Sequence, residues 1–189
     1  GQRPRPAQFE LGVPYSDPQA DGPTVQRANE IALSNGVESI KQCIAYVEEA
    51  RARGLTVPVI LMGYYNSFYQ FGVDQLASTG SGIIDGVIVV DLPMEESKSF
   101  VSALSPAGLS FIPLVTPVTP TNRIAALAQS SSSFIYCVSV TGVTGARDEL
   151  PTDLTDFVTR VRGETNVPLL VGFGVRSTEQ VGKVSSISD

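Results

Sequence analysis

The sequence predicts an α/β protein of the (βα)8 TIM-barrel type, in which helices connect the strands of a parallel sheet. Short apolar runs alternate with longer amphipathic stretches from end to end, which is typical of strands followed by crossover helices. The run at residues 83–90 is mostly apolar through its length, as expected for a strand that is buried on both faces of a parallel sheet.

Strands are expected where short apolar runs lie between turn-forming residues, at 8–12, 57–62, 83–90, 110–114, 133–138 and 167–171. Helices are expected where apolar residues recur at helical spacing, at 25–34, 39–53, 72–79, 95–107, 121–130, 154–163 and 178–184. This alternation fits either an open doubly wound sheet or part of an eight-stranded barrel.

Chain length favours part of a barrel over a whole one. Barrels of this type typically need about 250 residues, and the chain has 189. No change of composition divides the sequence into two domains, so residues 9–189 are expected to form one partial TIM-barrel domain. Residues 1–8 form an atypical lead segment, because their prolines and charges oppose the apolar element expected before Phe9.

Composition excludes several classes of partner. The 19 acidic and 13 basic residues give a net charge of −6, and the basic residues are scattered along the chain, so neither nucleic acid nor an anionic membrane surface is an expected partner. No apolar run approaches the roughly 20 residues that span a bilayer. The two cysteines have no metal or disulfide spacing, which suits a cytoplasmic protein.

The absence of histidine limits the possible chemistry, because histidine is the commonest general acid or base and a common metal ligand. A Schiff-base mechanism would need a buried lysine, but Lys41, Lys98 and Lys183 lie in amphipathic stretches where lysines are solvated. Carboxylates, tyrosines and backbone amides therefore remain as the candidate catalytic groups.

Glu10 is the first of these carboxylates. It interrupts an apolar strand near its carboxyl end, the end that faces the active site in a βα barrel. A carboxylate partly removed from water there can exchange protons near neutral pH. The alternative is a solvated strand-end glutamate or one that is paired with an arginine.

Asp21 lies in a Gly/Pro-rich turn just before a predicted helix, so it either belongs to the same pocket as Glu10 or caps that helix. Asp17 has the same two explanations, and capping is preferred for it. Asp91 ends the strand at 83–90 and either supports the pocket or caps a helix beginning near Glu95. For Tyr136, within an apolar strand, the ordinary expectation is a core tyrosine with a satisfied hydroxyl.

Two glycine-rich loops follow later strands, at residues 141–145 and 172–174. Glycine permits positive φ angles and a close approach of backbone amides to an anion, and barrel phosphate sites often use the loops after the last two strands. Each loop alone is a weak signal, because many βα turns contain glycine.

The run from Phe9 to Gln26, which includes Glu-Leu-Gly-Val-Pro and Ala-Asp-Gly-Pro, resembles the signature of the tryptophan synthase α subunit. Later motifs are similar to this family in the same order, at residues 61–66, 91–97, 139–145 and 171–175. The sequence of residues 61–66 resembles the fungal bifunctional form, in which an α domain precedes a pyridoxal-phosphate-dependent β domain.

The resemblance implies a lyase of L-tryptophan biosynthesis that cleaves indole-3-glycerol phosphate to indole and glyceraldehyde 3-phosphate without a cofactor. It implies that Glu10 is the acid/base group and that Asp21 holds the indole N–H, whereas Asp17 faces the β subunit. It also implies that the β subunit or domain is the partner and alone carries pyridoxal phosphate. The substrate-binding residues that it implies are Asp91, Tyr136, Thr144, Gly172, Phe173 and Gly174.

The family's first strand and its eighth strand with a Gly-Ser phosphate loop are expected to be missing from the 189 residues. The chain by itself is therefore expected to have little lyase activity. Two alternatives stay open: an inactive barrel fragment that only binds a β subunit, and another phosphate-binding barrel enzyme. The spacing of Glu10 and Asp21 disfavours the second.

Overall fold

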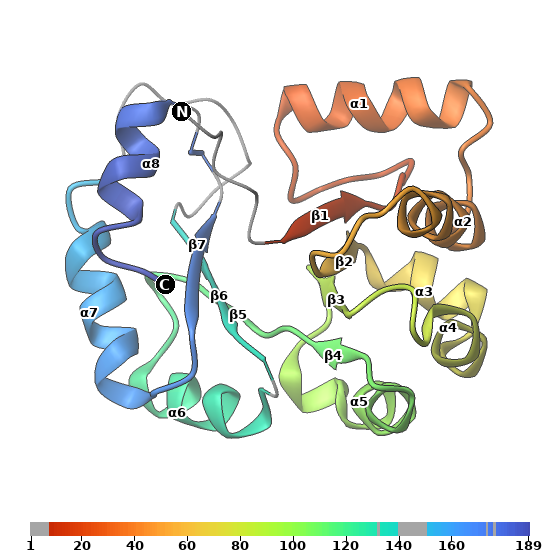
Figure 1. Cartoon of the computed structure of the whole chain (residues 1–189). Coiled ribbons are helices and arrows are strands. Elements are labelled where there is room, and N and C mark those ends of the chain that lie inside the picture. Colours follow the sequence, from red (N-terminus) through yellow and green to blue (C-terminus); the bar gives the residue numbers. More distant parts are fainter. Residues whose placement is uncertain (1–7, 132, 140–150, 173, 176) are drawn as a thin grey trace. The chain divides into compact units, whose positions relative to one another are not determined.

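A computed structural model describes residues 8–131, 133–139, 151–172, 174–175 and 177–189 (Figure 1). The chain divides into two compact units, the first made of residues 8–17 and 29–111 and the second of residues 18–28 and 112–189. Both units are built from parallel strands that alternate with helices. The predicted α/β class is therefore confirmed.

The first unit contains a four-stranded parallel sheet. Its strands are hydrogen-bonded in the chain order β1 (Phe9–Gly12), β2 (Val59–Gly63), β3 (Gly86–Val89) and β4 (Ser110–Phe111). In the register of this sheet Glu10 lies beside Ile60, and Ile60 lies beside Gly86. All four residues of β3 are buried, which agrees with the apolar run that predicted this strand.

Helices line one face of this sheet (Figure 1). In α2 (Ile40–Ala52) the buried residues Ile40, Cys43, Ile44 and Val47 follow helical spacing, and Ser39 and Gln42 form a capping box at the start. They pack in one cluster with residues of β2, β3, α4 (Val73–Gly80) and α5 (Lys98–Leu104). This cluster forms the core of the first unit.

The structure adds one helix that the sequence did not predict and divides another. Helix α3 (Tyr65–Phe71) directly follows β2 and is held by the fully buried side chain of Phe68. The single helix expected at 95–107 consists of the 3-10 turn η1 (Met94–Glu96), helix α5 and the 3-10 turn η2 (Ser105–Ala107). Pro106 lies in η2 and cannot continue an α-helical hydrogen-bond ladder.

The second unit contains a three-stranded parallel sheet. Its order is β5 (Leu114–Val115), β6 (Ile135–Val138) and β7 (Leu169–Gly172). Helices α6 (Thr121–Ser130), α7 (Leu154–Glu164) and α8 (Thr178–Val184) follow these three strands in the chain. Helix α1 (Pro23–Ser34) follows β1, and its residues are divided between the two units. None of its residues is buried.

The strand expected at 110–114 is two separate strands. β4 pairs with β3 in one sheet, whereas β5 pairs with β6 in the other. Pro113 lies between them and has no N–H to donate to a strand ladder. The single expected strand was therefore wrong at this proline.

An arginine–aspartate pair joins the amino ends of neighbouring strands in the first unit. The Arg51 guanidinium of α2 donates to Asp85 Oδ2 at 2.8 Å and to the Val57 carbonyl at 2.7 Å. Asp85 Oδ2 also accepts the N–H of Val59 at 2.8 Å, and the Asp85 N–H donates to the Val59 carbonyl at 2.9 Å. These bonds fix how β3 starts beside β2.

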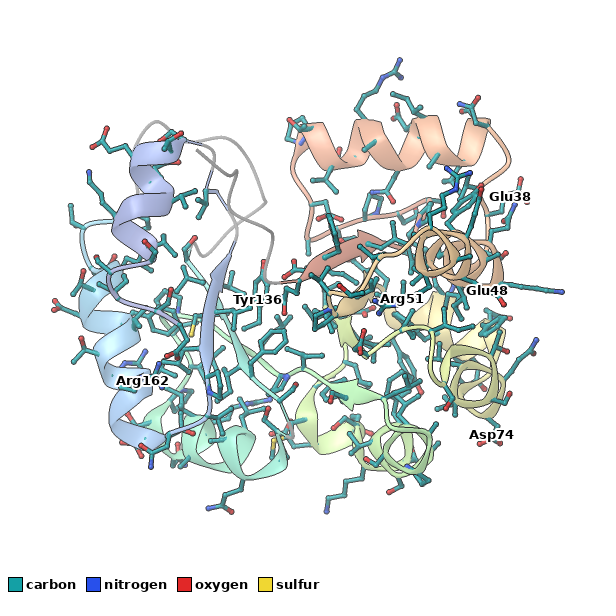
Figure 2. The ribbon with its side chains drawn as sticks, viewed as in Figure 1. Glu38, Glu48, Arg51, Asp74, Tyr136 and Arg162 are labelled. Atoms are coloured by element: carbon teal, nitrogen blue, oxygen red, sulfur yellow. The ribbon has the colours of Figure 1, made fainter. Side chains whose placement is uncertain are left out.

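The second unit repeats this arrangement. Arg162 of α7 pairs with Asp189 and donates to the Val167 carbonyl at 3.2 Å. Asp189 Oδ2 accepts the N–H of Leu169 at 2.8 Å, and the Asp189 N–H donates to the Leu169 carbonyl at 2.9 Å. Figure 2 labels both arginines. Each pair lies at the amino ends of its strands, opposite the ends that carry the candidate site.

Candidate active site

Glu10 lies on β1, at the edge of the first sheet. Leu11 packs against the core cluster, so the alternation of a strand places Glu10 on the opposite face of the sheet. The carboxylate accepts a hydrogen bond from Gln8 Nε2 at 3.1 Å and is exposed. The partial burial expected for it is not observed, because an edge strand covers its side chains less than a central one.

Asp91 follows β3 and has a partner that the sequence did not indicate. Its Oδ1 accepts the backbone N–H of Tyr65 at 2.6 Å, the first residue of α3. The expected cap of a helix near Glu95 is wrong, because η1 has no side-chain cap. Asp91 instead supplies the amino end of α3 with an acceptor that Tyr64, its N-cap residue, does not provide.

Asp21 lies in a turn two residues before α1. Its N–H donates to the Pro18 carbonyl at 3.0 Å, and its own carbonyl accepts from Gln26 Nε2 at 2.9 Å. These bonds fix the backbone on either side of the carboxylate, which is half-buried. Asp17 is exposed and accepts from the Ser16 hydroxyl at 2.6 Å, which is a local contact.

Tyr136 and Gly172 lie together in the second unit. Tyr136 is on β6 and is buried, with 6% of its surface exposed. It is paired with Leu170 of β7, and Val138 is paired with Gly172, so the Tyr136 ring extends along the strands toward their carboxyl ends. A Cβ atom on Gly172 would lie 1.8 Å from the Tyr136 hydroxyl oxygen. Only glycine leaves room for the phenol in this position.

The glycine loop after β7 begins at this contact. The Gly172 carbonyl accepts the N–H of Ser139 at 3.0 Å, and Gly174 has a φ of 74°, a left-handed conformation that favours glycine. Phe173 lies outside the described residues, and so do Thr144 and the rest of the predicted loop at 141–145.

The six predicted residues that the structure describes are divided between the units. Glu10 and Asp91 belong to the first, and Asp21, Tyr136, Gly172 and Gly174 to the second. In the first unit, Glu10 lies on β1 and Asp91 follows β3. Strand β2 lies between these two strands.

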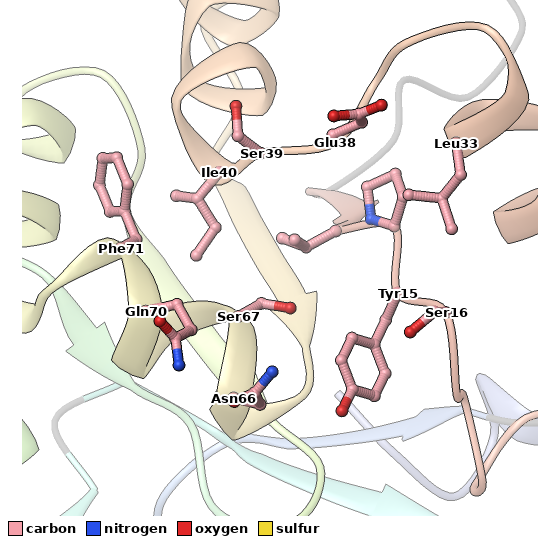
Figure 3. A pocket seen from close by; sticks show the side chains of 12 residues that line it. Tyr15, Ser16, Leu33, Glu38, Ser39, Ile40, Asn66, Ser67, Gln70 and Phe71 are labelled. Carbon is pink, nitrogen blue, oxygen red and sulfur yellow. The ribbon is translucent and has the colours of Figure 1, made fainter.

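A pocket of about 420 Å³ opens beyond the carboxyl ends of β1 and β2 (Figure 3). One wall of the pocket, at residues 14–16, lies within the family-like run from Phe9 to Gln26, whereas the other wall is on α3, which the sequence did not predict. The amphipathic pattern of α3 is too short to be recognised. The pocket is lined by Val13, Pro14, Tyr15, Ser16, Leu33, Glu38, Ser39, Ile40, Asn66, Ser67, Gln70 and Phe71.

The pocket combines aromatic, amide and hydroxyl groups. The Tyr15 ring stacks on Tyr64 with centroids 5.0 Å apart, and the Tyr15 N–H donates to Asn29 Oδ1 at 2.9 Å. Among the described residues that line the pocket, Glu38 is the only charged one. Such a surface can accept apolar and hydrogen-bonding groups together.

The two thiols are unreactive parts of the cores. Burial raises the pKa of Cys137 to about 12, with Arg162 acting weakly in the opposite direction, and burial also raises the pKa of Cys43. Both are free thiols. Within the described residues, no three His, Cys, Asp or Glu side chains gather in a way that could hold a metal. In that same part of the chain no helix is long and apolar enough to cross a membrane.

Parallel βα units with acidic, tyrosine and glycine residues on their strands or in the loops that follow them define an α/β enzyme of the barrel class. Residues 6–189 match the family described as tryptophan synthase alpha chain. The chain belongs to this family, whose members are lyases.

Proteins of similar sequence support this family assignment. The tryptophan synthase alpha chain of Roseiflexus castenholzii is 50% identical over 177 residues, which cover 93% of this chain and 67% of that protein. The tryptophan synthase of Saccharomyces cerevisiae is 43% identical over 183 residues, which cover 96% of this chain and 26% of that protein. The chain spans about two thirds of the length of its bacterial relatives.

Solved structures agree as well. Tryptophan synthase from Mycobacterium tuberculosis matches with a TM-score of 0.87 at 36% identity, over 97% of this chain and 69% of that one. A structure of the α2β2 complex from Pyrococcus furiosus matches with a TM-score of 0.84 at 35% identity, over 95% and 72% of the two chains. The predicted family and the barrel type are confirmed.

Proposed function

We propose that the chain catalyses the α reaction of tryptophan synthase, the cleavage of indole-3-glycerol phosphate to indole and glyceraldehyde 3-phosphate. One observation carries this proposal: Glu10 lies on a parallel strand, on the face opposite the packed helices, within the Glu-Leu-Gly-Val-Pro run of the family. Inward strand positions near the carboxyl end of a barrel are where catalytic side chains lie.

Glu10 acts as the general acid and base. Its carboxyl group gives a proton to the indole ring carbon that bears the glycerol chain, and its carboxylate accepts the proton of the adjacent glycerol hydroxyl. The carbon–carbon bond then breaks. Its electrons return to the indole ring, and the hydroxyl carbon becomes the aldehyde of glyceraldehyde 3-phosphate. The proton taken from the hydroxyl returns Glu10 to the protonated form in which the next turnover begins.

Asp21 holds the indole N–H and stabilises the positive charge that develops on the protonated ring. The bonds on both sides of Asp21 support this role, because they fix the backbone from which the carboxylate projects. A fixed charge needs no reorganisation during the reaction, which is what makes electrostatic catalysis effective.

Tyr136 and the glycine loop hold the rest of the substrate. The phenol supplies an apolar face and a hydroxyl, and the backbone amides of Gly172, Phe173 and Gly174 bind the phosphate. Thr144 contributes a hydroxyl. Asp91 holds the start of α3 and so supports the pocket that α3 forms with residues 14–16.

The reaction needs no cofactor, because proton transfer and fixed charges are sufficient for a retro-aldol cleavage. Pyridoxal phosphate belongs to the partner, a tryptophan synthase β subunit or domain. The pocket formed by residues 14–16 and α3 is the surface that we assign to this partner. The free thiols Cys43 and Cys137 support the cytoplasm as the compartment.

An assay of indole release tests the proposal, with the protein prepared as its gene encodes it. Indole and glyceraldehyde 3-phosphate should appear in equal amounts from indole-3-glycerol phosphate. Asp21→Asn should reduce turnover by about 100-fold, whereas Asp17→Asn, measured without a β subunit, should leave turnover within about two-fold of the original. Equal losses in both variants would reject the role of Asp21, and no indole release by the protein that the gene encodes, as distinct from residues 1–189 alone, would reject the function.

A further inference from the structure

A rigid turn follows β5 in the second unit. The Thr119 N–H donates to the Thr116 carbonyl at 3.0 Å, and the Thr116 N–H donates to Thr119 Oγ1 at 2.9 Å. The two threonine hydroxyls are 3.1 Å apart. Pro117 and Pro120 restrict the backbone on either side of Val118 and Thr119, so this turn has little freedom of its own.

Arg160 of α7 holds this turn from outside. Nη1 donates to the Thr119 carbonyl and Nη2 donates to the Pro117 carbonyl, each at 2.6 Å. The guanidinium carbon lies 5.6 Å from the centroid of the buried Phe157 ring, over its face. A planar guanidinium can donate to two carbonyls at once in this way, whereas a lysine ammonium cannot match both directions.

The turn begins beside the strand that carries Tyr136. Leu114 is paired with Tyr136 and Val115 with Cys137. Thr116 directly follows β5, and continuing the alternation of side chains along this strand by one residue puts Thr116 on the side of Leu114, the neighbour of Tyr136 in the sheet. Thr116 is half-buried at the carboxyl end of β5, the end at which barrel enzymes bind substrate.

We propose that Arg160 is a positioning residue for the substrate site, acting through Thr119 to fix the hydroxyl of Thr116 beside Tyr136. This inference rests on the proposed α reaction. Arg160 fixes the Thr119 carbonyl, Thr119 Oγ1 fixes the Thr116 N–H and hydroxyl, and Thr116 presents its hydroxyl to the bound substrate. Thr116 and Arg160 become determinants of substrate affinity, although neither carries out proton transfer.

The test compares steady-state kinetics and thermal unfolding of Arg160→Ala, Arg160→Lys, Thr119→Val and Thr119→Ser. Arg160→Ala and Thr119→Val should each raise KM for indole-3-glycerol phosphate about ten-fold and change kcat less than about two-fold, the pattern of lost uniform binding. Thr119→Ser keeps the hydroxyl and should stay near the original KM. Arg160→Lys should have a KM between those of the original protein and Arg160→Ala, because lysine keeps one of the two hydrogen bonds to the turn.

Two further comparisons separate positioning from a purely structural role. The double variant Arg160→Ala/Thr119→Val should be no worse in KM than either single variant, because both break the same chain of contacts. Arg53→Ala, which removes an exposed arginine paired with Glu49, is the matched control and should not change KM. If Arg160→Ala does not fold, Thr119→Val and Thr119→Ser decide the question.

An unchanged KM in Thr119→Val, or a lower melting temperature with no change in KM, would overturn the positioning role while the α reaction stands. Additive effects of the two substitutions would overturn it as well. If the unmodified protein releases no indole, the proposed function fails, and the role of Arg160 in substrate binding fails with it.

Discussion

The hydroxyl of Tyr136 lies where the side chain of any residue other than glycine at position 172 would begin. A Cβ on Gly172 would be 1.8 Å from the hydroxyl oxygen and 2.3 Å from Cζ of Tyr136. The ring is buried on β6, so it cannot move away without disturbing the packing around it. The two residues therefore determine together the shape of the site at the carboxyl ends of β6 and β7.

Gly172→Ala should destabilise the protein by about 1–3 kcal/mol, the usual cost of overpacking, and should raise KM by displacing the phenol. Urea denaturation and steady-state kinetics measure the two effects. Gly172→Ala combined with Tyr136→Ala should lose less stability than the sum of the single variants, because the clash is gone. The control is Gly163→Ala on α7, where an added Cβ meets nothing within 4 Å. A fully additive double variant would contradict the clash.

Asp91→Ala should cost about 1–2 kcal/mol, because it leaves the Tyr65 N–H at the start of α3 without its acceptor. Asp91→Asn keeps a side-chain oxygen and should cost less. Urea denaturation compares both with Glu48→Ala, which changes an exposed position of α2. Equal stability of Asp91→Ala and Glu48→Ala would show that the bond to Tyr65 does not hold α3.

Asp189 gives the second unit a pH-dependent contribution to stability. The N–H of Leu169, and after it Arg162, lower the pKa of this carboxyl. A lowered pKa in the folded protein means that the ionised form stabilises it, fully above the unfolded value of about 3.9 and progressively less as the pH falls through the folded value.

Asp189→Asn should therefore lower the free energy of unfolding at pH 7 by less than about 1 kcal/mol, because the pair is half exposed. The difference in the free energy of unfolding between Asp189→Asn and the original protein should shrink as the pH falls below about 4. Urea denaturation over a pH series measures it. If this difference in the free energy of unfolding grew as the pH fell, it would contradict the stabilising role of the ionised Asp189.

The sequence predicted most elements because their signals are local. Helices at 121–130 and 178–184 were predicted with the bounds observed for α6 and α8. Helix α3 was missed because aromatic residues and asparagine have modest helix propensity and seven residues show little periodicity. The strand at 110–114 was predicted as one because its apolar run is continuous, although Pro113 divides its hydrogen bonding between two sheets.

The site was predicted less completely, because its contacts join distant parts of the chain. Glu10 and Tyr136 could be selected from motifs, but the bond of Asp91 to Tyr65 spans 26 residues. The Arg51–Asp85 pair spans 34 residues, and no local pattern indicates it. Such bonds depend on how individual side chains of neighbouring elements meet, and no local pattern in the sequence specifies that.

The role of Glu10 is tested most directly by the turnover of Glu10→Gln with indole-3-glycerol phosphate. Glutamine keeps the size and the hydrogen bonding of the side chain but cannot exchange a proton. Turnover should fall by at least about 100-fold, with the free energy of unfolding nearly unchanged, because Glu10 is exposed on an edge strand. Indole release by Glu10→Gln at a rate close to that of the original protein would contradict its assignment as the acid/base group.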